Sequence, residues 1–420
     1  MSRMLCNKIL LLNTGTLEII KPHNSITFYF IKRYMVHSSV VQFKYQKMES
    51  TDVNLENLTK NKNDKLFPII DDLKNINPKY RNKILQNYLS FNISNTDLYF
   101  INRKESEKFV ELIKDDLFKE MSHVIETNPG FGLLTESLLE AGVPFLTLYE
   151  KNNDFYSDLH NLYMKYPKRF ILRKANLFRT SNILNSHSST TDVNITELLK
   201  NVSEKKWEES TCMQIIGTTT SNSFLKHLIM STLFQSSFMS HGRSSFYFAM
   251  SPFIWNKLTK FSRKLNTTYI MFNTLFNYKM FGTLDRNAFI PWQKKVSVCK
   301  STNQSSDCYV LYVVRLEPKP NVHTIFGGKE NLIHFWYFIR HHFYVPSQRI
   351  IPALEKQIPD CGIRLIKKNY NIFTEFGELN LTQIHDLFME LQSWPEYKAS
   401  TLMLGVNEMR KIYNSHIEEE

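Results

Sequence analysis

The amino-acid sequence predicts an α/β protein with a doubly wound, mostly parallel sheet that ends in an antiparallel hairpin and is followed by a small helical domain. Three observations support this fold class. Strand-like and helix-like patterns alternate from residue 97 to about residue 316. Within them, a glycine-containing turn joins one strand to the next helix. After Pro318-Lys-Pro320, apolar residues recur at helical spacing only.

The expected elements follow one another in a regular order. Strands are predicted at residues 123–125, 143–149, 169–174, 211–217, 244–250, 267–276 and 307–316. Helices are predicted at residues 66–89, 105–118, 133–139, 154–166, 224–234 and 253–265. Residues 180–210 are rich in Ser, Thr and Asn, so we expect a mobile surface loop there.

Composition divides the chain of 420 residues into four segments. Residues 1–50 are basic, and residues 51–95 form a polar linker with a helical stretch. Residues 96–320 carry the α/β pattern, and residues 321–420 form a helical domain of ordinary size. Two helical faces are expected there, one made by Leu332, Phe335, Trp336, Ile339 and Phe343 and another by Leu381, Ile384, Phe388 and Leu391.

The N-terminal segment has the composition of a targeting sequence. Residues 1–48 contain seven Lys or Arg and only one acid, Glu18, with apolar and hydroxyl residues between them. This pattern is typical of a mitochondrial presequence, with Arg33-Tyr34-Met35 as a plausible processing point. A basic, disordered extension that stays on the protein is the alternative.

The overall charge favours a polyanionic partner. Formal net charge is +12 with a pI near 9.2, which is typical of nucleic-acid-binding proteins. Removing residues 1–50 takes away seven bases and two acids and leaves about +7, so the body is still basic. No run of eighteen apolar residues occurs, and we therefore expect no membrane span.

Metal binding is not expected. The five cysteines form no CxxC pair and have no histidine at ligand spacing, which indicates reduced thiols. His334, His341 and His342 share a helical face, but no carboxylate or cysteine lies near them in the sequence. We interpret these histidines as structural or nucleic-acid-facing.

The most informative motif is Glu126-Thr-Asn-Pro-Gly-Phe-Gly132 between a predicted strand and a predicted helix. Glycines at 130 and 132 let the backbone approach a ligand, and the helix N-terminus offers free N–H groups. Glu150 ends the next strand, where a carboxylate accepts both hydroxyls of a ribose. An ordinary tight turn is the alternative interpretation of the glycines. The combination favours a nucleoside-binding α/β fold.

The string Glu126 to Thr135, followed by Leu138-Leu-Glu-Ala-Gly142, resembles the cofactor loop of the rRNA adenine N6-dimethyltransferase superfamily. More narrowly, the chain resembles the second paralogue of its mitochondrial transcription factor B branch, from about Asp97 to near the C-terminus. The resemblance implies a class I, Rossmann-like S-adenosylmethionine-dependent methyltransferase fold with a helical C-terminal domain. It implies cofactor contacts at Ile101, Glu126, Asn128, Gly130, Gly132, Glu150 and the position of Ala175.

One of these cofactor contacts lacks its expected residue type. The resemblance places an acid after the third strand of the glycine-turn unit, where it hydrogen-bonds the adenine amine of the cofactor. This chain has Ala175 there, and the neighbouring Asn176 offers only an amide carbonyl oxygen as a partial substitute.

The larger departure follows the next strand. Adenine N6-methyltransferases of this superfamily carry Asn-(Leu/Ile)-Pro-Tyr there, whose polar groups accept from the target amine and whose ring stacks on the flipped base. This chain has Gly217, Thr218, Thr219 and Thr220. Threonine hydroxyls can accept a hydrogen bond, but no ring is available for stacking. Methyl transfer needs the acceptor held in line with the methyl group, so we expect little or no adenine dimethylation.

The resemblance implies nucleic-acid contacts as well. Lys294 and Lys295 follow Trp292 in a polar setting. The family carries further bases after a His-x-Phe in the C-terminal domain, but this chain has Tyr344-Val345-Pro346 there, so Arg340 or Arg349 would have to serve.

Three functions remain open from the sequence. The first is a transcription initiation factor of the mitochondrial matrix nucleoid, which binds the mitochondrial RNA polymerase and helps melt promoter DNA. The second is an S-adenosylmethionine-dependent dimethyltransferase of small-subunit rRNA. The third is a non-catalytic ribosome-assembly factor that binds rRNA.

Overall fold

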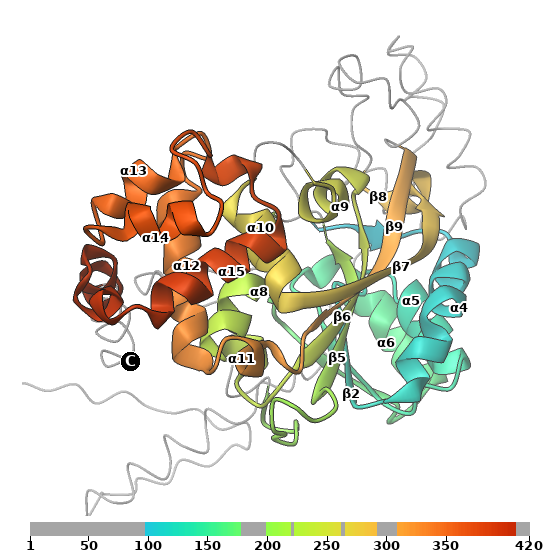
Figure 1. Ribbon diagram of the computed structural model, residues 1–420. Helices are drawn as coiled ribbons and strands as arrows, with labels where there is room; N and C mark the ends of the chain where they lie inside the picture. The colour runs from blue at the N-terminus through green and yellow to red at the C-terminus, as the bar shows by residue number, and fades with distance from the viewer. Residues whose placement is uncertain (1–96, 178–198, 220–221, 262–264, 292–308, 409–420) are drawn as a thin grey trace, which may run out of the picture. The chain divides into compact units, whose positions relative to one another are not determined.

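The computed structural model describes residues 97–177, 199–219, 222–261, 265–291 and 309–408 (Figure 1). All of them belong to one compact unit, Gln46–Glu420. The predicted presequence, the polar linker and the helix at 66–89 lie outside the described residues, as do Thr220, Trp292, Lys294 and Lys295. The division of the chain at residue 320 stays a prediction.

A seven-stranded mixed sheet, in the order β4-β3-β2-β5-β6-β9-β7, carries the fold. Its strands are β2 (His123–Thr127), β3 (Leu146–Tyr149), β4 (Phe170–Arg173), β5 (Met213–Thr219), β6 (Ser244–Met250), β7 (Phe276–Asp285) and β9 (Val310–Pro318). Strands β2 to β6 are parallel, whereas β9 pairs antiparallel with both β6 and β7. The strand order reverses between β2 and β5, and ligands bind at such switch points in open α/β sheets.

A second, two-stranded sheet joins β1 (Tyr99–Phe100) to β8 (Phe289–Ile290) in antiparallel register. It anchors the segment that precedes α4 (Arg103–Lys119). The segment at residues 97–101, for which the sequence predicts no strand, thus contributes the short strand β1.

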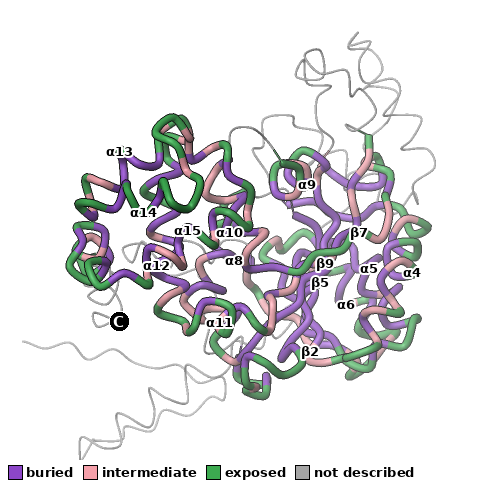
Figure 2. The backbone as a smooth tube through the Cα atoms, viewed as in Figure 1, coloured by how far each residue is buried: buried purple, intermediate pink, exposed green. Residues whose placement is uncertain are grey.

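Helices cover both faces of the large sheet (Figure 1). One face packs against α4, α5 (Leu133–Glu140) and α6 (Tyr156–Lys165), and the other against α8 (Asn222–Phe234), α9 (Pro252–Thr259) and α10 (Thr267–Leu275). The alternation of side chains along a strand separates the two cores. In β6, Phe246 and Phe248 belong to one core and Tyr247 to the other. Figure 2 shows the central strands β5 and β6 as buried along their length.

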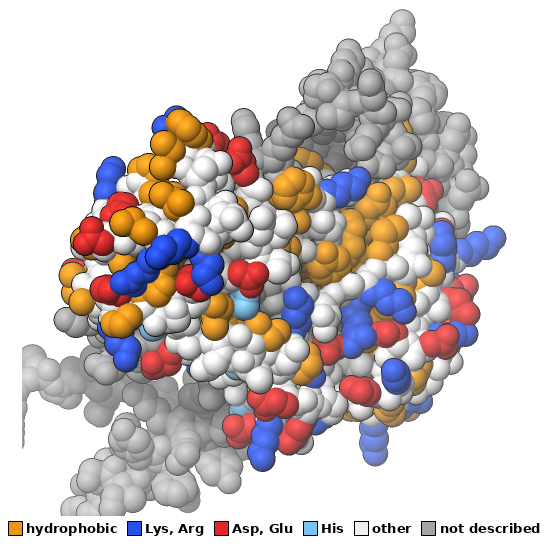
Figure 3. Space-filling model, in the orientation of Figure 1, with side chains coloured by type: hydrophobic (Ala, Val, Ile, Leu, Met, Phe, Trp, Pro, Cys, Tyr) orange, Lys and Arg blue, Asp and Glu red, His pale blue; other side chains and the backbone are white. Residues whose placement is uncertain are grey.

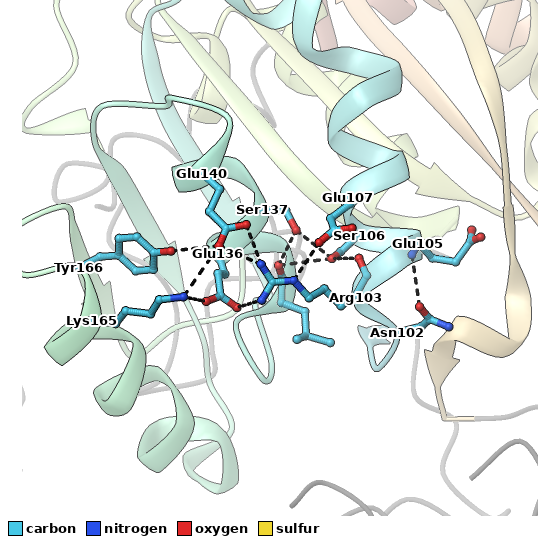
Figure 4. Close-up of polar contacts among 11 residues, drawn as sticks. Asn102, Arg103, Glu105, Ser106, Glu107, Glu136, Ser137, Glu140, Lys165 and Tyr166 are labelled. Atoms are coloured by element: carbon cyan, nitrogen blue, oxygen red, sulfur yellow. Dashed lines mark hydrogen bonds and ion pairs between the residues drawn. The ribbon is translucent and has the colours of Figure 1, made fainter. Parts of the chain in front are cut away.

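Ion pairs fix the helices on the first face (Figure 4). The Arg103 guanidinium on α4 donates to Glu136 at 3.0 Å and to Glu140 at 2.7 Å, both on α5. Lys165 at the end of α6 reaches Glu136 at 2.5 Å. Exposed pairs of this kind contribute little individually. As a network, they set the positions of the helices that follow the glycine turn.

The C-terminal region contains five α-helices among the described residues 322–393: α11 (Val322–Ile325), α12 (Lys329–His342), α13 (Ile350–Glu355), α14 (Cys361–Lys367) and α15 (Leu381–Ser393). Helix α12 packs against α8 and α10, so the core on that face of the sheet continues into the helical region. The predicted faces of α12 and α15 are buried, with only Leu381 partly exposed. None of the helices that the structure describes is long and apolar enough to cross a membrane.

The predicted strand at 267–276 is wrong, because these residues form α10 and the strand begins at Phe276. The side chain of Asn266 accepts a hydrogen bond from the Tyr269 N–H at 2.9 Å and caps the helix. The helix is buried on more than one side, because its own apolar residues point in several directions. Its buried residues are Tyr269, Ile270, Met271, Phe272 and Leu275. An apolar stretch of this length cannot be distinguished from a strand by periodicity alone.

The predicted surface loop is wrong for its last part, residues 199–210. Leu199, Val202 and Trp207 are buried in the core of the second face. The indole N–H of Trp207 donates to the Lys319 carbonyl at 3.1 Å. The buried Arg243 guanidinium donates to the Trp207 carbonyl at 2.7 Å and to the Glu317 carboxylate at 2.6 Å. The rest of the predicted loop, residues 178–198, lies outside the described residues.

Candidate cofactor site

The glycine turn lies at the carboxyl end of β2, beside the switch point of the sheet. Asn128, Gly130 and Gly132 have φ angles of 54°, 58° and 78°. A Cβ atom at Gly130 would lie 2.7 Å from Tyr99 Cδ1, and one at Gly132 would lie 2.9 Å from Leu162 Cδ2. Both positions therefore need glycine for conformation and for space.

Glu150 follows β3 and faces this turn. One carboxylate oxygen accepts from the Gly130 N–H at 3.1 Å, and the other accepts from the Asn152 N–H at 2.7 Å. Burial raises the pKa of Glu150 to about 7, although these hydrogen bonds oppose the rise. A carboxylate has about four acceptor positions, so Glu150 has the capacity to accept ligand hydroxyls as well.

Two polar side chains of the motif are buried with unpartnered atoms. The Thr135 hydroxyl donates to Glu126 Oε2 at 2.7 Å, while Glu126 Oε1 has no partner among the described residues. Burial raises the pKa of Glu126 to about 8. Asn128 is only 5 % exposed, and neither its amide oxygen nor its amide nitrogen has a partner within the described chain. Such atoms cost about 1–3 kcal/mol each when unsatisfied, so they indicate a place where a ligand's polar groups bind.

Residues 97–101, which we call the N-terminal strap, cross the carboxyl ends of the strands. The Thr218 hydroxyl at the end of β5 donates to the Leu98 carbonyl at 2.5 Å. The Ile101 N–H donates to the Ala288 carbonyl at 2.9 Å, and Ile101 is buried. Tyr99 covers Gly130. The strap is thus fixed to both sides of the switch point.

Ala175 is half-buried after β4, and its neighbour Asn176 is buried. The Asn176 amide donates to Asp97 Oδ2 of the strap at 3.0 Å. No role for Asp97 is predicted from the sequence. Its only local signal was an acid directly before a short apolar strand, and the pairing with Asn176 spans 79 residues.

The end of β5, where the family's base-binding motif is expected, is closely packed. A Cβ atom at Gly217 would lie 2.6 Å from Thr127 Cγ2 and 2.9 Å from the Thr127 carbonyl oxygen. Thr218 binds the strap, and Thr219 is buried. Within the described part of this motif, residues 217–219, there is no aromatic ring and no side-chain amide.

The candidate nucleic-acid residues that the structure describes lie on different elements of the helical region. Arg340 is exposed in the last turn of α12, 5.5 Å from the Trp336 ring. Arg349 is exposed before α13, 5.2 Å from the Phe373 ring. Positive and negative side chains are interspersed on the face in Figure 3. Lys294 and Lys295 lie outside the described residues, so the structure does not bring the four bases together.

The structure also bears on the histidines of α12. His334 and His342 are buried, whereas His341 is exposed. Burial lowers the pKa of His342 to about 3, which keeps this ring neutral. Across the described ranges, no group of three or more His, Cys, Asp or Glu side chains is placed to hold a metal ion.

The sheet order, the glycine turn at the switch point and the acid after β3 define a Rossmann-like fold of the S-adenosylmethionine-dependent methyltransferase class, as the sequence predicted. Residues 74–393 match the family model for ribosomal RNA adenine dimethylase, and the chain belongs to this family. The chain is also similar to the Drosophila melanogaster protein "Dimethyladenosine transferase 2, mitochondrial". The two are 29 % identical over 342 residues, which cover 70 % of this chain and 75 % of the relative.

Solved structures of rRNA methyltransferases resemble the chain as well. The 23S rRNA methyltransferase ErmE has 14 % identity and a TM-score of 0.43, over 70 % of this chain and 100 % of that one. A dimethyladenosine transferase from Plasmodium falciparum has 11 % identity and a TM-score of 0.43, over 70 % of this chain and 97 % of that one.

Proposed function

We propose that this protein is a mitochondrial transcription initiation factor that works with the mitochondrial RNA polymerase to melt promoter DNA. It is built on an rRNA adenine dimethylase fold whose base-reacting motif has decayed. The observation that carries the proposal is the end of β5, where Gly217 is closely packed against Thr127. Because this half of the site is filled, the family fold would serve here as a binding scaffold.

The packing at β5 argues against adenine dimethylation in chemical terms. Methyl transfer depends on an acceptor nitrogen held in line with the methyl group. No room exists at Gly217 for an amide side chain, and the Thr218 proton is already donated to Leu98. The threonine oxygens can still accept a hydrogen bond, but a flipped base would have no ring to stack on at residues 217–219.

The cofactor half of the site fits S-adenosylmethionine. Glu150 would hold the ribose hydroxyls, while the glycine turn allows close approach of the ligand. Unpartnered atoms of Glu126 and Asn128 provide one carboxyl oxygen and one complete amide for the rest of the molecule. Ile101 and the Ala175 position would line the site. When bound, the cofactor supplies a methyl group on a positively charged sulfur.

Binding to promoter DNA would be mainly electrostatic. The chain has a formal net charge of +12. Exposed Arg340 and Arg349 are available to phosphates, and Lys294 and Lys295 add two further candidate contacts. Each phosphate contact makes binding weaker as salt rises. The exposed ring of Phe373, beside Arg349, adds a surface on which an unpaired base can stack.

The proposed location is the mitochondrial matrix, at the nucleoid. The basic, acid-poor residues 1–48 support a transit peptide. The Drosophila relative carries "mitochondrial" in its name. Both observations agree with a polymerase partner in the same compartment.

A second function is favoured by one specific observation. The buried, unpartnered atoms of Glu126 and Asn128 are what a working cofactor site would need. An active S-adenosylmethionine-dependent dimethyltransferase of mitochondrial small-subunit rRNA is therefore the alternative. A non-catalytic ribosome-assembly factor would use the same basic surfaces without methyl transfer.

The proposal is tested by run-off transcription from a duplex mitochondrial promoter with the cognate polymerase, with and without this protein and without S-adenosylmethionine. We expect strong stimulation on the duplex and none on the same template melted in advance around the start site. A variant lacking both exposed arginines, Arg340→Ala with Arg349→Ala, should stimulate less. No stimulation of the duplex template would reject the proposal and leave the two rRNA functions.

A further inference from the structure

We propose that Asp97 recognises the exocyclic amine of a bound adenosine-containing cofactor, in place of the acid that position 175 lacks. This inference deepens the cofactor part of the proposed function and rests on it. The strap would then contribute to selecting the ligand's base in addition to covering the site.

The position of Asp97 is the first argument. The resemblance to the dimethyltransferases places the adenine-binding acid at Ala175, which has no polar side chain. The next residue, Asn176, donates to Asp97 Oδ2 at 3.0 Å. A carboxylate is therefore present beside the expected location, although it comes from a segment 79 residues earlier in the chain.

The surroundings of Asp97 are the second argument. Strands β2, β3 and β4 are neighbours in the sheet, and their carboxyl ends carry Gly130, Glu150 and Asn176 in that order. Burial is the main cause of the raised pKa of Glu150, and the charge of Asp97 raises it further. The two carboxylates thus lie close enough to interact. Together they provide acceptors for the two ends of an adenosine, the ribose hydroxyls and the base amine.

Independent evidence for a ligand at this edge comes from Asn128 and Glu126. Both side chains are more than nine-tenths buried and carry unpartnered atoms; Glu126 lies near the end of β2, and Asn128 lies in the glycine turn that donates to Glu150. These atoms need a polar ligand whatever the role of Asp97.

The chemistry of Asp97 fits an amine donor. Asp97 is 7 % exposed, and its carboxylate, which accepts from the Asn176 amide, can act only as an acceptor when ionised. An amine that donates to a buried carboxylate forms a charge-assisted hydrogen bond, which is stronger than a neutral one. Hypoxanthine carries a carbonyl oxygen where adenine carries the amine, so it would place an acceptor against the carboxylate.

The test compares S-adenosylhomocysteine with S-inosylhomocysteine by isothermal titration calorimetry on the full-length chain. We expect the wild-type protein to prefer the adenosine compound by about tenfold or more, the effect of one hydrogen bond to a charged group. Asp97→Ala should remove this preference mainly by weakening the adenosine compound. Asp115→Ala, which removes an exposed acid on α4, is the matched control and should leave both affinities unchanged.

A second variant separates recognition from structure. Asp97→Ala combined with Ala175→Asp should restore the preference, because it returns a carboxylate to the family position. Equal weakening of both ligands in Asp97→Ala, or no preference in the wild type, would overturn the role of Asp97 while leaving the cofactor site intact. Failure of the wild type to bind either compound would overturn both the role of Asp97 and the cofactor site. The proposed promoter opening does not need the cofactor and is measured separately, so it would not be affected.

Discussion

The carboxyl ends of β2 and β5 lie next to each other in the sheet but have different properties. After β2, the backbone opens into a glycine turn with unpartnered buried atoms on Glu126 and Asn128. After β5, Gly217 is packed against Thr127 and Thr218 is bonded to the strap. We propose that the first end holds a cofactor and that the second no longer presents a base. In this proposal, binding and reaction have decayed separately within one fold.

Thr127 connects the two ends. It is the last residue of β2 and leads into the glycine turn, while its side chain and carbonyl occupy the space beside Gly217. A substitution at Gly217 therefore also affects the glycine turn after β2. Because the two strand ends are coupled in this way, substitutions can test the difference between them.

The largest expected effect is that of Gly217→Asn, which returns the amide of the family motif. Its Cβ atom would lie 2.6 Å from Thr127 Cγ2, and a displacement of the strand is needed to relieve the overlap. We expect a loss of about 3 kcal/mol in the free energy of unfolding, as for other overpacked buried sites. Urea denaturation measures it. Gly327→Asn is the control, because a Cβ atom there would make only an ordinary contact, 3.5 Å from Asn331 Nδ2, and Asn tolerates the φ of +66°.

Glu126→Gln should change how stability depends on pH. Burial raises the Glu126 pKa from 4.5 to about 8, so the folded state holds a proton that the unfolded state releases. Stability from this group is complete below pH 4.5 and is lost as pH rises to about 8. Gln stays neutral, so we expect the variant to gain up to about 5 kcal/mol relative to wild type between pH 4.5 and pH 8. A stability difference that does not vary between pH 5 and pH 8 would contradict the assignment.

Thr218→Val should have a smaller effect, about 1 kcal/mol, because it removes one buried hydrogen bond to the Leu98 carbonyl while keeping the side-chain volume. Hydrogen exchange of the strap should become faster, since Leu98 loses its anchor at β5. Thr283→Val on the exposed surface of β7 is the matched control. Unchanged exchange in the strap would show that β1 and β8 alone hold it.

The smallest expected effect is on DNA binding by the helical region. Arg349→Ala should lower the slope of log affinity against log salt by about 1, the value for one phosphate contact. Fluorescence anisotropy with a partly melted promoter duplex measures the slope. Arg364→Ala is the control, since this exposed arginine is already paired with Glu396 at 2.7 Å. An equal change in both variants would remove Arg349 from the interface.

The sequence was sufficient where the structure is local. The glycine turn, the acid after β3 and the order of strands and helices follow from patterns within about 20 residues. The helix α10 was not predicted because its own apolar residues lie on several sides and leave no helical periodicity in the sequence. The buried end of the predicted loop was missed because Trp207 depends on Lys319, more than 100 residues away.

The candidate site shows the same limit. Loss of the base-binding motif could be predicted from Gly217 and its neighbours, but the packing of Thr127 against that glycine required the structure. Asp97 could not be assigned from the sequence, since its partner Asn176 is distant in the chain. The roles proposed for Arg340, Arg349, Lys294 and Lys295 stay predictions.

The most direct test of the two-sided site measures binding and methyl transfer in one sample. The full-length chain is titrated with S-adenosylmethionine bearing a labelled methyl group, and an excess of the small-subunit rRNA helix is then added. We predict saturable cofactor binding and no label in the RNA, because the β2 end binds and the β5 end cannot present the base. Transfer of one or more methyl groups per protein molecule would contradict this account.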